Sequence, residues 1–430
     1  MPVSDPGTVK TYLHRPRTMS NLHPTRTVPV LLPRYVSRFS CIGPKCEDNC
    51  CTGWRVSIDK KTFNAYRQTK DPELVELLAE NVRRQRSQAS DANYARIELK
   101  ADTKACPLME ERLCAVQKKM GESYLSDTCF SYPRHSRKFG GQYEQALRLS
   151  CPEAARQALL AADAFDFVEG MTTVRLNTVA EVKPKQGVSL ELMNEVRIFC
   201  LKLIRTEGLE LWQKLAVLGV FCESLTNTLA KAEHSAVPSL LDSFTVMVEK
   251  GLVLDALAEM QPNHSAQALV FLAFWQRKKD ATVSVVQNKV FEAIAKGLGA
   301  NAETGQVTAA QLVDCYSHGV TRLPEALQAA PHVLEHYLLN EMFCDLFPFH
   351  GASPYQNYLQ LVSRFGLLRL MLAAQCNTNG PLPDAAALVQ TVQVYCRRFQ
   401  HDLTFATQVN QVLTDSGWAK LDKVYGFLRA

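Results

Sequence analysis

The sequence predicts a mainly α-helical protein, in which a cysteine-rich metal-binding N-terminal domain with a small hairpin precedes an irregular helical bundle. Eight of the 14 cysteines lie within the first 151 residues. Beyond residue 189, apolar residues recur at helical spacing almost throughout, without the fixed period of a solenoid repeat. The chain is long enough for more than one domain. We therefore expect an extended or disordered arm, a cysteine-rich domain, a linker and a helical domain, at residues 1–34, 35–165, 166–188 and 189–430.

The arm at residues 1–34 is rich in Pro, Thr, Arg and His and shows no hydrophobic periodicity, which is typical of an extended or disordered segment. It contains no apolar stretch of the kind that marks a secretory signal. No run of about 18 apolar residues occurs along the chain, so we expect no transmembrane segment. A chain that is not exported keeps its cysteines in a reducing compartment, where disulfides are rare. We therefore expect a cytoplasmic protein whose thiols are free or bound to metal.

Local signals predict a series of short elements after the arm. Asp59 and Asp71 precede helical patterns and carry the side chain that caps helix N-termini, and Pro72 suits the first turn. Gly140-Gly141 separates two strand-like stretches and is typical of a hairpin turn. We expect helices that begin near residues 60 and 72, a short strand at residues 94–100 and a hairpin at residues 137–149.

The next helix start involves a cysteine. The sequence Ser150-Cys151-Pro152-Glu153 fits a capping box, with Ser150 as the N-cap and Glu153 at the third helical position. Cys151 would then lie at a helix N-terminus, where the helix dipole favours a thiolate. The thiolate is the form of cysteine that binds metals, so the local structure and the proposed chemistry agree.

The second half of the chain reads as successive amphipathic helices. Leu192, Val196, Phe199 and Leu203 share one predicted face, and later segments repeat this spacing. The six cysteines of this half are isolated from one another, and free cysteine is among the most buried residue types. We interpret them as small buried hydrophobic residues: Cys200, Cys222, Cys315, Cys344, Cys376 and Cys396.

The most informative motif is the run C-x4-C-x3-C-C at Cys41–Cys51, in which Gly43, Pro44, Asp48 and Asn49 bend the chain between thiols. Such spacing brings several sulfurs toward one point, which a packed core does not require and a metal centre does. The candidate metal ligands are the eight N-terminal cysteines: Cys41, Cys46, Cys50, Cys51, Cys106, Cys114, Cys129 and Cys151.

Spacing separates zinc from an iron–sulfur cluster only weakly. A zinc ribbon pairs two short knuckles, and the isolated thiols from Cys106 onward do not form a second one. Because adjacent side chains diverge, we do not expect Cys50 and Cys51 to bind one tetrahedral zinc, whereas a cluster offers ligand sites several ångströms apart. We therefore favour an iron–sulfur cluster, with zinc as the alternative. Two four-thiolate sites, redox or catalytic thiols, and simple burial of Cys114 and Cys129 are left open.

Positive charge is concentrated in the cysteine-rich part, since residues 1–151 contain 25 Lys and Arg against 16 Asp and Glu. This excess would suit a nucleic acid or an anionic membrane surface. No basic motif interleaved with aromatic residues accompanies it, so we expect no nucleic-acid partner. Peripheral membrane contact and an oligomeric state are left open. The chain also lacks a G-x-G-x-x-G turn, a P-loop, an H-E-x-x-H motif and a C-x3-C-x2-C cluster motif.

Several motifs resemble those of flagellin lysine-N-methylases. The likeness covers roughly residues 28–425 and is carried by the segments Phe39–Trp54, Cys106–Cys114, Cys129–Arg134, Gly140–Glu144, Ser150–Arg156 and Leu211–Cys222. The second and third of these segments also resemble part of a related zinc- or iron-chelating cysteine domain.

The resemblance implies an enzyme that transfers methyl groups from S-adenosyl-L-methionine to the ε-amino groups of lysines on flagellin, in the bacterial cytoplasm. It also implies a 4Fe–4S cluster held by the N-terminal cysteines, without saying which four of the eight are ligands. It identifies neither the S-adenosylmethionine pocket nor a catalytic base. Two other classes stay as alternatives: a non-catalytic metal-binding adaptor whose helical domain binds a partner protein, and an iron–sulfur oxidoreductase that uses Cys50-Cys51.

Overall fold

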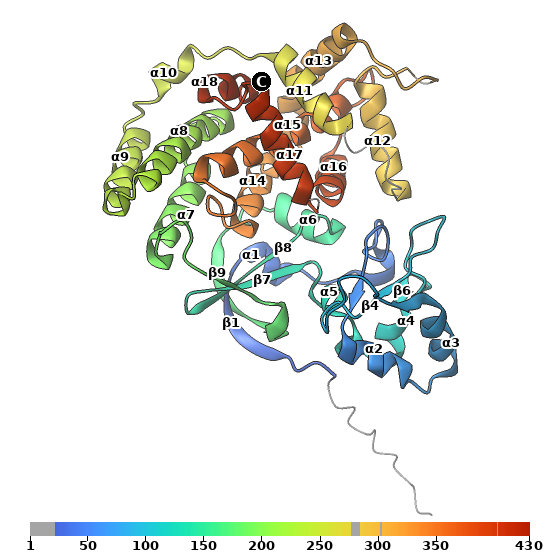
Figure 1. Cartoon of the computed structure of the whole chain (residues 1–430). Coiled ribbons are helices and arrows are strands. Elements are labelled where there is room, and N and C mark those ends of the chain that lie inside the picture. The colour runs from blue at the N-terminus through green and yellow to red at the C-terminus, as the bar shows by residue number, and fades with distance from the viewer. Residues whose placement is uncertain (1–21, 277–283, 302, 402) are drawn as a thin grey trace, which may run out of the picture.

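The computed structural model describes residues 22–276, 284–301, 303–401 and 403–430. Residues 1–21 of the predicted arm lie outside these ranges, and the end of that segment forms strand β1 (Arg26–Pro33). Helices fill the upper part of the view in Figure 1, a sheet lies beneath them, and the cysteine-rich segments lie to one side of the sheet. The chain is mainly α-helical, as predicted.

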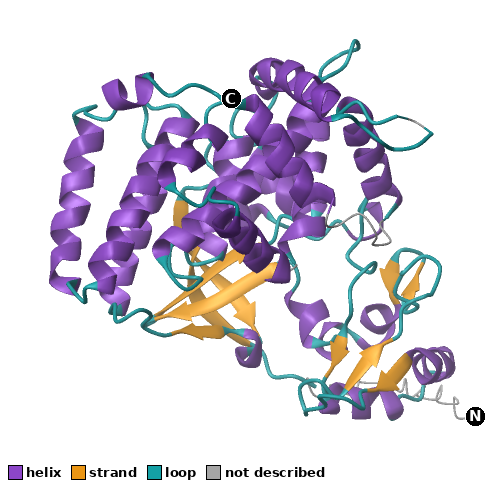
Figure 2. Cartoon of the chain, turned by 45° about the horizontal axis from the view of Figure 1, so that its top comes forward, coloured by secondary structure: helices purple, strands orange, loops and turns teal. Residues whose placement is uncertain are grey.

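A five-stranded sheet joins distant parts of the chain in the order β10-β7-β8-β1-β9. β1 pairs in parallel with β8 (Gln142–Leu147) and antiparallel with β9 (Phe167–Val174). β7 (Arg134–Phe139) pairs antiparallel with β8 and in parallel with β10 (Ala180–Val182). Figure 2 shows these strands gathered below the helices.

The β7–β8 hairpin is confirmed. Phe139 pairs with Gln142, which leaves Gly140-Gly141 as the turn, and Gly140 has a φ of +56° that glycine adopts without strain. The other strands of this sheet are not predicted by the sequence. β9, the 3-10 turn Leu176–Thr178 and β10 all lie within the predicted linker at residues 166–188.

The cysteine-rich region has a small core of its own. Its helices are α2 (Lys60–Arg67), α3 (Pro72–Asn81), α4 (Ala115–Met120) and α5 (Asp127–Ser131). Its strands are β2 (Ser57–Ile58), β3 (Val82–Arg84), β4 (Ala95–Ile97), β5 (Met109–Glu110) and β6 (Leu113–Cys114). The core contains the fully buried side chains of Ile58 and Leu74. Asp59 and Asp71 cap α2 and α3, as predicted, because their carboxylates accept hydrogen bonds from backbone N–H groups of the first turn.

The helical half begins on the sheet and continues to the C-terminus. Its helices are α6 (Pro152–Leu159), α7 (Leu190–Arg205), α8 (Leu211–Ala230), α9 (Val237–Glu249), α10 (Leu254–Ala258), α11 (His264–Gln276), α12 (Val285–Gly297), α13 (Ala309–Leu327), α14 (Val333–Cys344), α15 (Pro354–Cys376), α16 (Ala385–Tyr395), α17 (Leu403–Asp415) and α18 (Leu421–Val424). A short helix, α1 (Arg34–Arg38), follows β1. In the described part of the chain, none of the helices has the length and apolar content needed to cross a membrane.

Helix α15 is the centre of this half. It packs against α8, α11, α12 and α13, and most of its residues are buried. Two glycines let α12 and α13 approach the backbone of α15 closely: a Cβ on Gly297 or Gly319 would come within 1.8 or 2.0 Å of a carbonyl oxygen of α15. Of the six isolated cysteines, Cys315 is half-buried and the other five are buried, as the sequence indicates.

The sheet and the helical half share one hydrophobic core, which includes Val30 of β1, Leu147 of β8 and Leu338 of α14. Polar contacts reinforce this packing. The hydroxyl of Tyr35 donates to Oδ1 of Asn340 over 2.6 Å, and the guanidinium of Arg137 donates to main-chain carbonyls at the end of α14. The helical half therefore holds the sheet, and through it the cysteine-rich region, in a defined position.

Candidate functional site

Six of the other seven candidate cysteines lie near enough to Cys50 to interact with it electrostatically. Its thiolate charge acts on the thiols of Cys46, Cys51, Cys106, Cys114, Cys129 and Cys151. Cys41, like Cys50 and Cys129, is exposed. Across the residues that the structure describes, no three Cys, His, Asp or Glu side chains meet with the geometry of a formed metal site. The fold thus brings the thiols into one neighbourhood, and metal ligation stays a prediction.

Main-chain hydrogen bonds place the run of cysteines beside Cys106. The N–H of Cys106 donates to the carbonyl of Cys51 over 2.7 Å, and Thr52 pairs with Ala105 in an isolated bridge. The side chain of Asn49 accepts from the N–H of Cys51 and closes a tight turn before it. Sulfurs that are distant in sequence are therefore held together by ordinary backbone pairing.

Cys50 and Cys51 lie close enough for their thiols to interact. Their thiols form a hydrogen bond, which is the main reason why the pKa of Cys50 falls to about 7 while that of Cys51 rises far above its ordinary value. The guanidinium charge of Arg397 also favours the Cys50 thiolate. The iron–sulfur cluster, with zinc as the alternative, stays a prediction for this place.

The other thiols are held in their neutral form by their surroundings. Burial raises the pKa of Cys46 and Cys106 to about 11 and that of Cys129 to about 12. Each additional thiolate in the group would make the next one harder to form. A bound metal or cluster takes thiolates as ligands and offsets this repulsion, so the donor set is chemically suited to such a group.

The N-terminus of α6 differs from the predicted capping box, because Cys151 rather than Ser150 occupies the N-cap position. The N–H groups of Glu153 and Ala154 favour the Cys151 thiolate, yet burial outweighs them and the pKa rises to about 12. The hydroxyl of Ser150 instead lies 2.9 Å from Nε2 of His401.

A segment of the helical half binds the loop at residues 46–53, called the cysteine loop, through hydrogen bonds and an ion pair. After α16 the chain forms a short π-helix at Cys396–Gln400, a rare conformation that occurs often at functional sites. From it, Arg397 donates to the carbonyls of Asp48 and Thr52 over 2.9 and 2.8 Å and pairs with the Asp48 carboxylate at 3.1 Å. Gln393 donates to the same carboxylate over 3.0 Å. Asp48, which the sequence suggests only as a turn residue, is therefore an anchor that is 3% exposed.

Aromatic side chains add to the contact between the cysteine loop and the helical half. Trp54 packs edge-on against the rings of Tyr132 and His401, with centroid distances of 4.5 and 5.5 Å. The Tyr132 hydroxyl lies 3.1 Å from that of Ser150. The tryptophan that follows the cysteine run is thus part of the contact between the two regions.

A buried charged cluster lies beyond the π-helix. Asp345 pairs with Arg148 at 3.0 Å and with Arg364 at 2.9 Å, and these guanidinium groups outweigh burial and hold its pKa below the usual range. Glu341 accepts a hydrogen bond from Gln400 of the π-helix, and burial together with the Asp345 charge raises the pKa of Glu341 to about 7. The sequence does not reveal this cluster, since Arg148 follows β8, almost 200 residues before Glu341 of α14 and Arg364 of α15, two helices that read as apolar.

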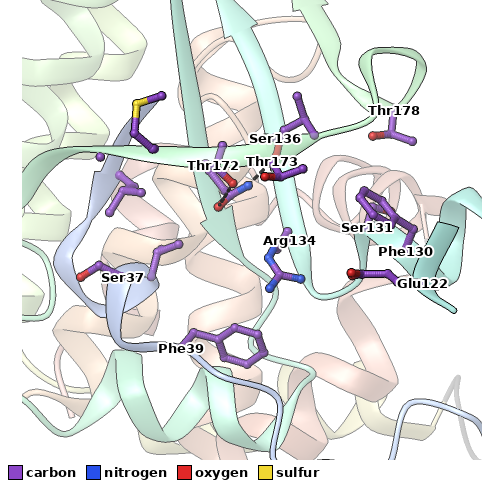
Figure 3. A pocket seen from close by; sticks show the side chains of 16 residues that line it. Ser37, Phe39, Glu122, Phe130, Ser131, Arg134, Ser136, Thr172, Thr173 and Thr178 are labelled. Atoms are coloured by element: carbon purple, nitrogen blue, oxygen red, sulfur yellow. Dashed lines mark hydrogen bonds between the residues drawn. The ribbon is translucent and has the colours of Figure 1, made fainter. Parts of the chain in front are cut away.

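A cavity of about 440 Å³ opens on the sheet beside the thiol group (Figure 3). Its walls come from β7, β9, α1 and α5, and α5 also carries Cys129. The cavity is lined by Phe39, Arg134, Glu122 and Phe130, among others. No motif in the sequence indicates a role for these four side chains.

Fold and site together define a helical protein with a thiol-rich centre that the C-terminal half clasps. Comparison with known proteins identifies the family. Residues 197–427, more than half of the chain, match the FliB lysine N-methylase C-terminal domain. The chain belongs to the FliB lysine N-methylase family, and it is a protein-lysine N-methyltransferase. This decides against the non-catalytic adaptor and the oxidoreductase as the primary class.

Relatives with curated names agree with this assignment. The lysine-N-methylases of Salmonella typhimurium (strain LT2) and Salmonella choleraesuis (strain SC-B67) are each 24% identical over 385 residues, which span 88% of this chain and 93% of the relative. The flagellar biosynthetic protein FliU of Salmonella muenchen is 34% identical over 140 residues, which span 32% of this chain and 82% of that protein. No solved structure matches the chain.

Proposed function

We propose that this enzyme methylates lysine ε-amino groups on flagellin in the bacterial cytoplasm, with S-adenosyl-L-methionine as the methyl donor and an iron–sulfur cluster on the N-terminal cysteines. The family assignment supports lysine methylation over most of the chain. The flagellar name of one relative supports a flagellar substrate. The observation that supports the cluster is that six other candidate thiols lie near enough to Cys50 to interact with it electrostatically.

We propose a polar displacement, with a radical route supported by the cluster as the alternative. A lysine ammonium, whose ordinary pKa is about 10.4, first loses a proton to a base. The neutral amine then forms a bond to the methyl carbon while the bond between that carbon and the sulfonium sulfur breaks, which leaves S-adenosylhomocysteine. The protein must align nitrogen, carbon and sulfur and keep the amine unprotonated.

The thiols of Cys50 and of the six cysteines around it would supply the ligands of a 4Fe–4S cluster, with zinc as the alternative. Bound at this place, either group would neutralise several thiolates and cross-link the loop around Cys50 to Cys106 and Cys151. Two roles are compatible with that position: stabilising the cysteine-rich region, as structural metals do, or taking part in cofactor binding.

Anaerobic purification tests the cluster. Iron and acid-labile sulfide in equal amounts, with a broad visible absorption that bleaches in air, would support it. A colourless protein with stoichiometric zinc would replace the cluster by zinc and leave the methylation proposal intact. Cys50→Ser should lower the bound metal, and Cys222→Ser, at a buried cysteine outside the thiol group, is the matched control.

Methyl transfer is tested separately with purified flagellin and isotopically labelled S-adenosylmethionine. Label on flagellin lysines, located by mass spectrometry, is the expected result. Label that appears equally on an unrelated lysine-rich protein would refute flagellin as the specific substrate.

A further inference from the structure

We propose that the cavity of Figure 3 binds the amino-acid end of S-adenosylmethionine, with Arg134 receiving the carboxylate and Glu122 the ammonium group. This inference rests on the methyl donor of the proposed function and adds the place where that donor binds. The volume of the cavity, about 440 Å³, falls in the range of roughly 300–1,000 Å³ that is usual for small-ligand sites.

The floor of the cavity is polar and fixed. Gln145 of β8 is 3% exposed; its amide nitrogen donates to the Ser136 hydroxyl over 2.8 Å, and its amide oxygen accepts from Thr172 over 3.2 Å. This leaves the Ser136 hydroxyl with a hydrogen to donate and the Thr172 oxygen with lone pairs to accept. A ligand with hydroxyl groups, such as a ribose, finds one donor and one acceptor here.

Opposite charges face each other across the cavity without pairing. In Figure 3 the carboxylate of Glu122 points toward the guanidinium of Arg134. Within the described ranges of the chain, neither side chain forms an ion pair, whereas Arg137, Lys138 and Arg148 of the same hairpin region each pair with an acidic residue. Arg134 is the exception in a hairpin whose other cations are all paired.

A zwitterion is the ligand that satisfies both charges at once. Guanidinium groups bind carboxylates through two parallel hydrogen bonds, and a carboxylate such as Glu122 accepts from an ammonium group. Both side chains are exposed, and a lysine side chain of a protein substrate would complement Glu122 but not Arg134. The pair of charges therefore favours a free α-amino acid moiety.

Two phenylalanine rings indicate what the rest of the ligand is. Phe39 and Phe130 are half-buried in the wall; the guanidinium of Arg134 lies 5.6 Å from the Phe39 ring centre and that of Arg175 lies 4.1 Å from the Phe130 ring centre, so a ligand can use only the other face of each ring. Aromatic faces accept a flat base by stacking and attract cations such as a sulfonium. S-adenosylmethionine combines a zwitterionic end, a sulfonium, a ribose and a flat base.

The test is direct binding to the anaerobically purified full chain, measured by calorimetry with S-adenosylhomocysteine, which cannot transfer a methyl group. Arg134→Gln should weaken binding about tenfold, equivalent to about 1.4 kcal/mol. Glu122→Gln should weaken it by a similar factor. Arg67→Gln removes an exposed arginine of α2 and should leave the affinity unchanged.

A second ligand isolates the amino-acid end. 5′-Methylthioadenosine keeps the base and ribose but lacks the zwitterion, so its weaker binding should be the same in the wild type and in Arg134→Gln. Equal affinity of wild type and Arg134→Gln for S-adenosylhomocysteine would overturn the site while leaving the methyl donor in place. If the wild type binds no S-adenosylhomocysteine, the donor itself is refuted, and the site with it.

Discussion

Arg397→Met should open the cysteine loop without disturbing the rest of the fold. The side chain of Arg397 is 11% exposed, and it makes two hydrogen bonds to loop carbonyls and an ion pair with Asp48, whose side chain is 2% exposed. A hydrogen bond from a charged donor contributes about 1.5–3 kcal/mol. Removing one partner of a buried ion pair costs about 3–5 kcal/mol. Because Asp48 keeps its hydrogen bond from Gln393, we take the lower end, about 3 kcal/mol.

Hydrogen–deuterium exchange of the loop is the appropriate assay, since this loss acts on local opening rather than on global unfolding. At 1.4 kcal/mol per factor of ten, exchange of the amides in residues 46–53 should accelerate about 100-fold. Methionine preserves the bulk of the arginine stem, so packing changes little. Arg67→Met, on the exposed surface of α2, is the matched control and should change nothing. Exchange in the loop that stays within threefold of the wild type would show that the π-helix does not clasp it.

Three further outcomes are expected. Gly319→Ala, whose Cβ would meet a backbone carbonyl of α15 at 2.0 Å, should lower the Tm, because overpacking costs about 1–3 kcal/mol of stability. Gly141→Ala, with nothing within 4 Å of the added Cβ, should leave the Tm unchanged. Equal Tm values for the two variants would contradict the α13–α15 packing. The folded-state pKa of Glu341 of about 7 lies above the ordinary 4.5, so the folded protein binds the extra proton and stability falls as pH rises between these values. Relative to the wild type, the free energy of unfolding of Glu341→Gln should therefore rise between pH 5 and 7.5, by up to about 3 kcal/mol, and a pH-independent difference in thermal or denaturant unfolding would refute this. Cys50→Ser should reduce bound metal more than Cys41→Ser, because the Cys50 charge acts on six other candidate thiols, and equal metal contents would make Cys41 as important a ligand as Cys50.

Local signals in the sequence predict the elements that short-range chemistry determines. Asp59 and Asp71 cap their helices because an aspartate one residue before a helical pattern can satisfy the first-turn N–H groups. The hairpin is predicted because Gly140-Gly141 lies between two strand-like stretches. At the start of α6 the same reasoning misplaces the cap by one residue.

Long-range pairing is what the sequence does not reveal. Strand β1 contains Pro29 and Pro33, which argue against a strand, and its partners β8 and β9 lie more than 100 residues further along the chain. Likewise, Asp48 and Arg397 are ordinary surface residue types until the fold brings them together. The dense cysteine run is visible in the sequence, but the approach of Cys106 and Cys151 to Cys50 depends on the whole fold.

The central claim is that the thiol-rich centre and the helical half together form a lysine methylase acting on flagellin. One measurement tests it most directly: mass spectrometry of flagellin lysines after incubation with S-adenosylmethionine and anaerobically purified protein, as wild type and as Cys50→Ser. We expect methylated lysines with the wild type and a marked loss with Cys50→Ser. Full methylation by a metal-free Cys50→Ser protein would contradict a role for the thiol group, and no methylation by metal-loaded wild type would contradict flagellin as the substrate.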